Sequence, residues 1–219
     1  MARQSDGVES ALQRRVASAR LNPSAGRLRE IRMEAFLTST LVVALAEIGD
    51  KTQLLSLILA ARYRKPLPIV AGIFVATIAN HFLAGALGAW IRTLMPPEFM
   101  RWAVGGSMLA IAAWTLIPDK FDGEVRQATR AGLFALTCVV FFIAEMGDKT
   151  QIATVVLAAQ YQPLYAIVIG TTLGMMIANV PVVYLGKSFS HRIPFHIVRR
   201  VTAVLFAVLG IAALTGVGG

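Results

Sequence analysis

The sequence predicts an all-α membrane protein with six transmembrane helices, built as two inverted three-helix repeats. Three observations predict this fold class: a low content of charge, apolar runs of membrane-spanning length, and a motif that occurs twice. Of the 219 residues, 56% are hydrophobic and only 15% are charged, whereas a soluble domain carries roughly 25% charged residues. Apolar runs of about 20 residues, the length that crosses a bilayer, recur from about residue 35 onward.

The breaks between the apolar runs place the helices. Prolines and charged residues separate the runs, as in ARYRKPLP (61–68), MPPE (95–98) and PDKFDGEVRQATR (118–130). Such residues commonly end helices and form loops. The six predicted helices span residues 35–61, 67–92, 99–117, 131–159, 163–186 and 197–217.

The repeat rests on the motif AEIGDKTQ (46–53), which recurs 98 residues later as AEMGDKTQ (144–151). IAN at 78–80 also recurs as IAN at 177–179. We therefore expect residues 33–117 and 131–219 to be two copies of one three-helix unit, joined by a linker at 118–130. Because three spans are an odd number, the second copy enters the membrane from the opposite side, as in many secondary transporters.

The distribution of positive charge predicts the orientation. Loops on one side of the predicted helices carry ten Lys or Arg residues, and loops on the other side carry only Arg92 and Arg101. The positive-inside rule then makes the 118–130 linker cytoplasmic and puts the domain ends outside. Residues 1–32 hold seven arginines and would oppose this rule. They lack the apolar core of a secretory signal, and we expect a disordered polar tail, with Met33 as an alternative native start.

Acidic residues lie inside two of the predicted spans. Glu47 and Asp50 fall near the middle of one span, and Glu145 and Asp148 near the middle of another. A charged side chain at the bilayer centre costs roughly 2.5–3.5 kcal/mol. The Glu-x-x-Asp spacing places both carboxylates on one face of a continuous helix. If the two copies face each other, four carboxylates converge with the amides of Gln53 and Gln151.

This set of ligands indicates a hard divalent cation. Carboxylate and amide oxygens suit Ca²⁺ and Mn²⁺, and Mg²⁺ less readily. Without a metal ion, four clustered carboxylates cannot all remain ionised, because burial and mutual repulsion favour protonation. Cation binding would expel protons and protonation would expel the cation, which is the physical basis of a cation/proton antiporter. We identify no nucleophile arrangement, and expect neither enzymatic activity nor a cofactor.

Other residues of the motifs have two interpretations each. Lys51 and Lys149 either form i,i+4 salt bridges with the motif glutamates or balance the charge of the acidic cluster, and we favour the second. Gly49 and Gly147 allow close helix packing or a local helix break. The remaining polar residues are candidate ligands or proton-coupling groups, or else structural hydrogen-bonding groups: Thr52, Thr150, Asn80 and Asn179, with Gln53 and Gln151 as above.

The two motifs resemble the paired Glu-x-Gly-Asp-Lys/Arg-Thr/Ser motif of a divalent cation/proton exchanger family. This family includes the Golgi Gdt-type manganese and calcium transporters of eukaryotes and manganese exporters of bacteria, within the lysine-exporter superfamily. The resemblance covers about residues 33–217. It implies six helices in two inverted halves, with Glu47, Asp50, Glu145 and Asp148 in cation binding and H⁺ as counter-ion. The short middle loop resembles that of bacterial members.

Together these observations predict a secondary transporter that exports Mn²⁺, or Ca²⁺, in exchange for H⁺. We expect it in the bacterial plasma membrane. Its expected partners are the divalent ion and the lipid bilayer, without nucleic acid, and the sequence predicts no particular oligomeric state. Alternating access would rock one repeat against the other. Two alternatives remain: an exporter of a cationic organic solute, and a membrane scaffold whose charges only hold helices together.

Overall fold

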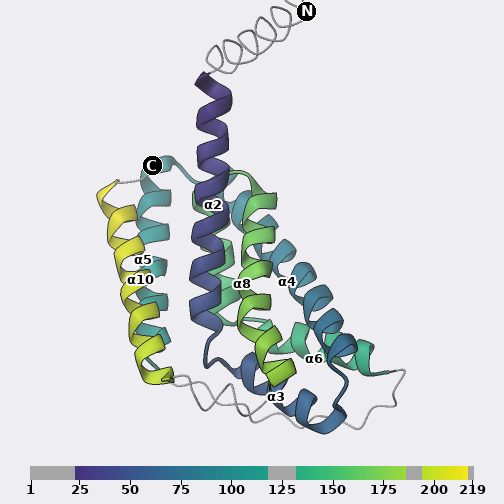
Figure 1. Ribbon diagram of the computed structural model, residues 1–219. Coiled ribbons are helices and arrows are strands. Elements are labelled where there is room, and N and C mark those ends of the chain that lie inside the picture. The colour runs from purple at the N-terminus through teal and green to yellow at the C-terminus, as the bar shows by residue number, and fades with distance from the viewer. Residues whose placement is uncertain (1–22, 118–131, 186–193, 217–219) are drawn as a thin grey trace, which may run out of the picture.

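The computed structural model describes residues 23–117, 132–185 and 194–216, and within these ranges the chain is helical, without strands (Figure 1). The predicted linker 118–130 and residues 1–22 lie outside the described residues. Residues 23–32, predicted as the end of the tail, are the first turns of a helix. The helices are α2 (Pro23–Glu47), α3 (Lys51–Tyr63), α4 (Pro66–Leu94), α5 (Pro97–Thr115), α6 (Leu133–Glu145), α7 (Lys149–Gln160), α8 (Leu164–Leu185) and α10 (Phe195–Thr215).

Four helices, α4, α5, α8 and α10, begin and end within about two residues of the predicted bounds. α4 and α5 start with Pro66 and Pro97, at the first helical position, where the missing N–H of proline costs no hydrogen bond. α10 ends before Gly216, whose φ of 75° is left-handed. Glycine adopts this conformation without strain and commonly ends helices.

The predicted continuous helices 35–61 and 131–159 are wrong at the motifs, because each is two helices. α2 ends at Glu47 and α3 begins at Lys51; α6 ends at Glu145 and α7 begins at Lys149. Each break contains a glycine with positive φ, 84° at Gly49 and 73° at Gly147. A residue with a Cβ would be strained in this conformation by about 1–2 kcal/mol. The glycines therefore serve the local break rather than close helix packing.

Within the described residues, three helical segments are long and apolar enough to cross a membrane: Pro66–Leu94, Leu164–Leu185 and His196–Thr215. α3, α6 and α7 have only 13, 13 and 12 residues, so each is about 20 Å long against the roughly 30 Å of a bilayer core. Large apolar side chains face outward, among them Trp90 at 59% and Phe99 at 66% exposure. Such a surface suits lipid rather than water.

The main helix contacts join the two predicted repeats instead of separating them. α2 packs along α8 (Figure 1). α4 packs along α6 and α7. Glycines make these contacts close: a Cβ on Gly88 would lie 2.1 Å from the Val155 carbonyl oxygen, and one on Gly174 would lie 2.6 Å from that of Thr40. The six helices α2, α3, α4, α6, α7 and α8 thus form one interleaved unit, called here the core bundle.

α5 and α10 form a second unit, called here the helix pair. They lie side by side in Figure 1, next to α2. A Cβ on Gly105 would lie 2.9 Å from the Gly210 carbonyl oxygen, so the two backbones approach closely. The helix pair packs on the core bundle mainly through α2 and α7.

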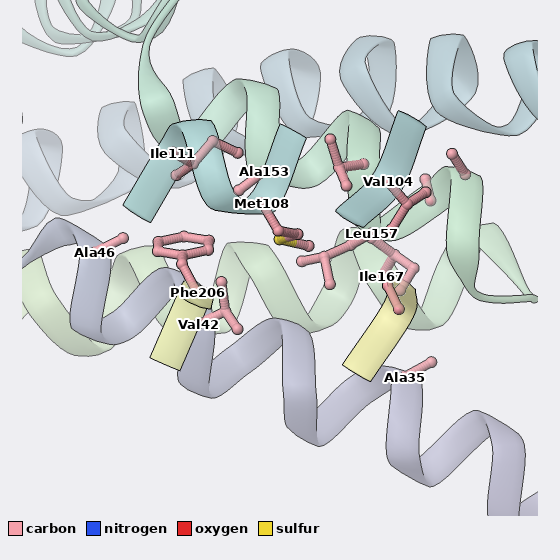
Figure 2. Close-up of a cluster of buried hydrophobic side chains, with 14 of the residues drawn as sticks. Ala35, Val42, Ala46, Val104, Met108, Ile111, Ala153, Leu157, Ile167 and Phe206 are labelled. Atoms are coloured by element: carbon pink, nitrogen blue, oxygen red, sulfur yellow. The ribbon is translucent and has the colours of Figure 1, made fainter. Parts of the chain in front are cut away.

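Two buried apolar clusters fill the molecule. The first, called the Phe206 cluster, joins α2, α5, α7, α8 and α10 through side chains such as Val42, Met108, Leu157 and Phe206 (Figure 2). The second, called the Phe141 cluster, is built from α2, α3, α4, α6 and α8 and includes Phe141. Among the described residues, the Phe141 cluster contains no side chain from α5 or α10. The helix pair therefore supports only one of the two clusters.

Replacing Gly88 by alanine should destabilise the core bundle, because its Cβ would collide with the backbone of α7. Overpacking of this kind costs about 1–3 kcal/mol. The control is Gly106→Ala in α5, where a Cβ meets nothing within 4 Å and alanine is the better helix former. Thermal unfolding in detergent should show a lower Tm for Gly88→Ala and an unchanged or higher Tm for Gly106→Ala. Equal Tm values would contradict the close α4–α7 contact.

Candidate cation site

The candidate site lies where the two helix breaks meet. In each break the aspartate N–H donates to the glutamate carbonyl three residues earlier, at 3.0 Å for Asp50 to Glu47 and 3.1 Å for Asp148 to Glu145. Glu47 and Asp50 are therefore not on one face of a continuous helix, as the spacing had predicted. The glutamate ends one helix, and the aspartate precedes the next. The turn between them aims both carboxylates toward the other motif.

Matching hydrogen bonds hold the two breaks in the same shape. The Thr52 hydroxyl donates to Glu47 Oε2 at 2.6 Å, and the Thr150 hydroxyl donates to Glu145 Oε2 at 3.0 Å. The Gly49 N–H donates to Gln53 Oε1 at 3.0 Å, and the Gly147 N–H makes the same bond to Gln151 at 2.7 Å. The threonines thus orient the glutamates. The glutamine oxygens satisfy backbone donors that the break leaves without helical partners.

The lysines pair across the two motifs. Lys51 Nζ lies 3.1 Å from Asp148 Oδ1, and Lys149 Nζ lies 3.0 Å from Asp50 Oδ1. The alternative of i,i+4 salt bridges along one helix is wrong, because Glu47 and Lys51 belong to different helices, as do Glu145 and Lys149. Each lysine instead balances the charge of the aspartate in the other repeat.

Three of the four predicted acids come together. Glu47, Glu145 and Asp148 each offer an oxygen, and these three atoms lie within 4.8 Å of one another. Asp50 is fully buried but lies outside this group, held by Lys149. The predicted convergence of the motifs is therefore seen for three carboxylates, called here the three-acid group, with the fourth beside it in an ion pair.

The three-acid group is buried and incompletely satisfied. Glu47 and Glu145 are 0% exposed and Asp148 is 2% exposed. Glu47 Oε1, Glu145 Oε1 and Asp148 Oδ2 accept no hydrogen bond from the part of the chain that the structure describes. Leaving a buried acceptor unsatisfied costs about 1–3 kcal/mol, and more for a charged group. A cation bound among the three carboxylates would reduce this cost.

The amide side chains support the breaks from the neighbouring helices. Asn80 Oδ1 accepts from Gln151 Nε2 at 2.7 Å, and the Asn80 amide donates to the Phe142 carbonyl at 3.3 Å. In the first motif, Gln53 Nε2 donates to the Ala178 carbonyl on α8 at 3.1 Å. Asn179 Oδ1 accepts from Ser56 at 2.7 Å. All four amide oxygens are thus already used, which favours the structural interpretation over ligation.

Ser56 is the contributor that sequence reasoning missed. It is fully buried on α3, one turn after Thr52, and it fixes the orientation of Asn179. Its position in the other repeat is Thr154, also buried, whose hydroxyl donates to the Thr150 carbonyl at 2.8 Å. A small hydroxyl residue at the same place in both repeats was the signal that would have identified it.

The site has the charge and the donor atoms of a hard-cation site. The four motif carboxylates and two ammonium groups leave a formal charge of −2 when all are ionised, which one divalent cation balances. Oxygen-only ligands suit Mn²⁺ and Ca²⁺. Breaks in helices at the centre of a bundle are also where secondary transporters bind ions.

Comparisons with known proteins agree with this chemistry. The family model "Divalent cation/proton antiporter GDT1" matches residues 35–123 and 133–217, so it contains both breaks. A Vibrio cholerae protein named "Putative manganese exporter" is 52% identical over 181 residues, covering 82% of this chain and 90% of that protein. The GDT1-like protein 5 of Arabidopsis thaliana is 30% identical over 220 residues, covering 83% and 96%.

A GDT1-like protein of Synechocystis is 27% identical over 202 residues, covering 83% of this chain and 97% of that protein. No solved structure matches the chain. The matched residues include both motifs and the helices around the three-acid group, with α2 matched from residue 35 onward. The chain belongs to the GDT1 family of divalent cation/proton antiporters.

Proposed function

We propose that this protein exports Mn²⁺ from the cytoplasm in exchange for H⁺, with Ca²⁺ as an alternative substrate. The observation that carries the proposal is the three-acid group, in which buried carboxylates from both motifs keep one oxygen each without a hydrogen-bond partner. Because oxygen ligands accept both ions, the preference for Mn²⁺ is supported by the name of the Vibrio cholerae relative.

Exchange for H⁺ follows from the use of one set of carboxylates for both ions. A protonated carboxylate is a poor metal ligand, so metal binding releases protons. Glu47 and Glu145 each keep one oxygen in a hydrogen bond from a threonine and leave the other open. The cation and the protons therefore compete for the same atoms, and neither enzymatic chemistry nor a cofactor is needed.

Six spans in two inverted repeats account for the helices. α6 and α7, placed end to end, reach roughly 40 Å, which exceeds the ~30 Å of the hydrocarbon core. We count α2–α3 and α6–α7 as one broken span each and α4, α5, α8 and α10 as one span each. The matching glycines, hydrogen bonds and crossed lysines of the two breaks support the repeat, and an odd number of spans per repeat supports its inversion.

The orientation follows from charge at the bundle ends. Three basic residues lie where α3 is followed by α4: Arg62 in the last turn of α3, and Arg64 and Lys65 directly after it. Near the turn between α4 and α5 the basic residues are Arg92 and Arg101. By the positive-inside rule, the end with α3, α6 and the Phe141 cluster faces the cytoplasm of a bacterial plasma membrane. The end with α2, α7 and the Phe206 cluster faces outward.

We propose that alternating access occurs by movement of the helix pair against the core bundle. The two predicted repeats interleave through α2–α8 and α4–α7 contacts, so we propose movement of the helix pair in place of the rocking of one repeat against the other that the sequence predicted. The helix pair contacts α2 close to the first helix break: the Thr202 hydroxyl on α10 donates to the Leu45 carbonyl, two residues before Glu47, at 3.0 Å. We propose that the helix pair closes the end of the core bundle that contains the Phe206 cluster, to which α5 and α10 contribute, and leaves the end with the Phe141 cluster uncovered.

The two other functions fit the site less well. The oxygens of the three-acid group lie within 4.8 Å of one another, a spacing that suits a metal ion better than an organic cation. The aromatic residue Phe141 is fully buried in its apolar cluster. A pure scaffold would leave the three oxygens without a partner, at a cost in stability that no function would offset.

Glu47→Gln or Asp148→Asn should abolish exchange while the protein still inserts. Each change removes one charged ligand, and we expect the apparent affinity for Mn²⁺ to fall at least about 30-fold, or roughly 2 kcal/mol. The control is Glu34→Gln, which removes an exposed carboxylate from the same helix, α2. The measurement is Mn²⁺-driven proton flux in proteoliposomes that contain a pH-sensitive dye.

Wild-type rates in either site variant would contradict the shared site. Flux driven by an organic cation and not by Mn²⁺ would favour the second function, and no flux with any cation would favour the scaffold. Elution of each variant as a monodisperse peak in detergent confirms that lost flux is not lost folding.

Tying α10 to α2 should also stop exchange. In a Cys138→Ser background, Leu45→Cys with Thr202→Cys places one thiol on each helix at their hydrogen-bonded contact. The matched control is Leu109→Cys with Gly210→Cys inside the helix pair, where a Cβ on Gly210 lies 3.0 Å from Leu109 Cγ. We expect a short bifunctional thiol reagent to block flux in the first variant only. Full flux through the cross-linked first variant would contradict movement of the helix pair.

A further inference from the structure

We infer that Lys51 is a tethered counter-cation that makes the site selective for divalent over monovalent cations. The inference rests on the proposed function and adds a role for a side chain that binds no cargo. Lys51 and Lys149 occupy equivalent positions in the two motifs, but the structure places them differently with respect to the three-acid group and to solvent.

Lys51 is paired with a member of the three-acid group. Its ammonium lies 3.1 Å from Asp148 Oδ1, while Asp148 Oδ2 has no hydrogen-bond partner among the described residues. Lys149 is paired with Asp50, which is outside the group. Asp148 therefore belongs both to the ion pair with Lys51 and to the three-acid group. A cation that binds to this group lies close to the positive charge of Lys51.

Lys51 is also less enclosed than Lys149. Its side chain is 25% exposed, whereas that of Lys149 is 2% exposed. Lys51 is the first residue of α3, directly after the helix break, and among the described residues α3 makes none of its main contacts with the helix pair. A lysine stem is flexible and can keep its ammonium in water while the rest stays buried. Lys51 can thus leave Asp148 when a cation arrives, and Lys149 lacks the exposure to do the same.

The charge of the incoming ion decides whether this displacement is favourable. A monovalent ion that replaces the ammonium at Asp148 brings the same charge to the site and gains little electrostatic energy. A divalent ion brings twice the charge and interacts with all three carboxylates, so its attraction outweighs the lost ion pair. Lys51 thereby excludes abundant monovalent ions, and it weakens divalent binding enough for the ion to be released.

Removing the charge of Lys51 should tighten cation binding and relax selectivity. We expect Lys51→Met to bind Mn²⁺ about tenfold more tightly than wild type, because the site loses a neighbouring positive charge. We also expect Na⁺ to compete with Mn²⁺ in Lys51→Met and not in wild type. Lys51→Arg, which keeps the charge, should resist Na⁺ as wild type does. The measurement is Mn²⁺ titration of purified protein by thermal shift, in NaCl or in N-methylglucamine chloride.

The matched control is Lys65→Met, which removes a lysine at the N-cap of α4, outside the site. Weaker Mn²⁺ binding by Lys51→Met, or Na⁺ competition that is the same in wild type and Lys51→Met, would overturn the inference. A purely structural lysine would lower the Tm without metal and leave the Na⁺ dependence unchanged. Should Lys51→Met fail to fold, Lys51→Gln keeps a polar contact with Asp148 and supports the same comparison.

The two hypotheses fail in different ways. If wild-type protein binds no Mn²⁺ at all, the proposed function fails. If wild type and Lys51→Met bind Mn²⁺ with equal affinity and equal indifference to Na⁺, the proposed function stands and the role of Lys51 fails.

Discussion

The crossed ion pairs between the two motifs are the interaction on which the rest of this structure depends. The two motifs place six ionisable side chains inside the bundle, and each would be costly there alone. Lys51 reaches Asp148 and Lys149 reaches Asp50, so neither motif is neutralised without the other. The electrostatic cost of burial is offset only when the repeats meet. This requirement explains why charge occurs twice in the sequence, in the same form.

The helix breaks make the crossing possible. In a continuous helix, backbone bonds would use the carbonyls and amides around Gly49 and Gly147, and the motif side chains would point along one stripe. The glycines with positive φ separate one helix from the next. Gln53 and Gln151 accept hydrogen bonds from the glycine N–H groups that the break leaves without helical partners. The interleaved packing of α2 on α8 and of α4 on α7 then brings the breaks together. Stability and cation binding therefore depend on the same residues.

Much of this arrangement could be predicted from the sequence, and the limits have physical causes. Prolines and charged turns located α4, α5, α8 and α10, because these signals are local. The helix breaks were not the preferred interpretation of the sequence, because the apolar pattern runs through them and the φ of a glycine cannot be predicted from the residue type. The crossed lysines and the separation of Asp50 from the three-acid group depend on tertiary contacts that spacing alone does not contain. The role of Ser56 also depends on a tertiary contact, because its partner Asn179 is distant in the sequence.

The most direct test of the shared site is an anomalous difference map from crystals grown with Mn²⁺ and measured at the manganese absorption edge. The account requires one strong peak within coordination distance of Glu47, Glu145 and Asp148, with ligands from both repeats. A peak bound by the acids of one motif only, or a manganese ion elsewhere with this site empty, would contradict it.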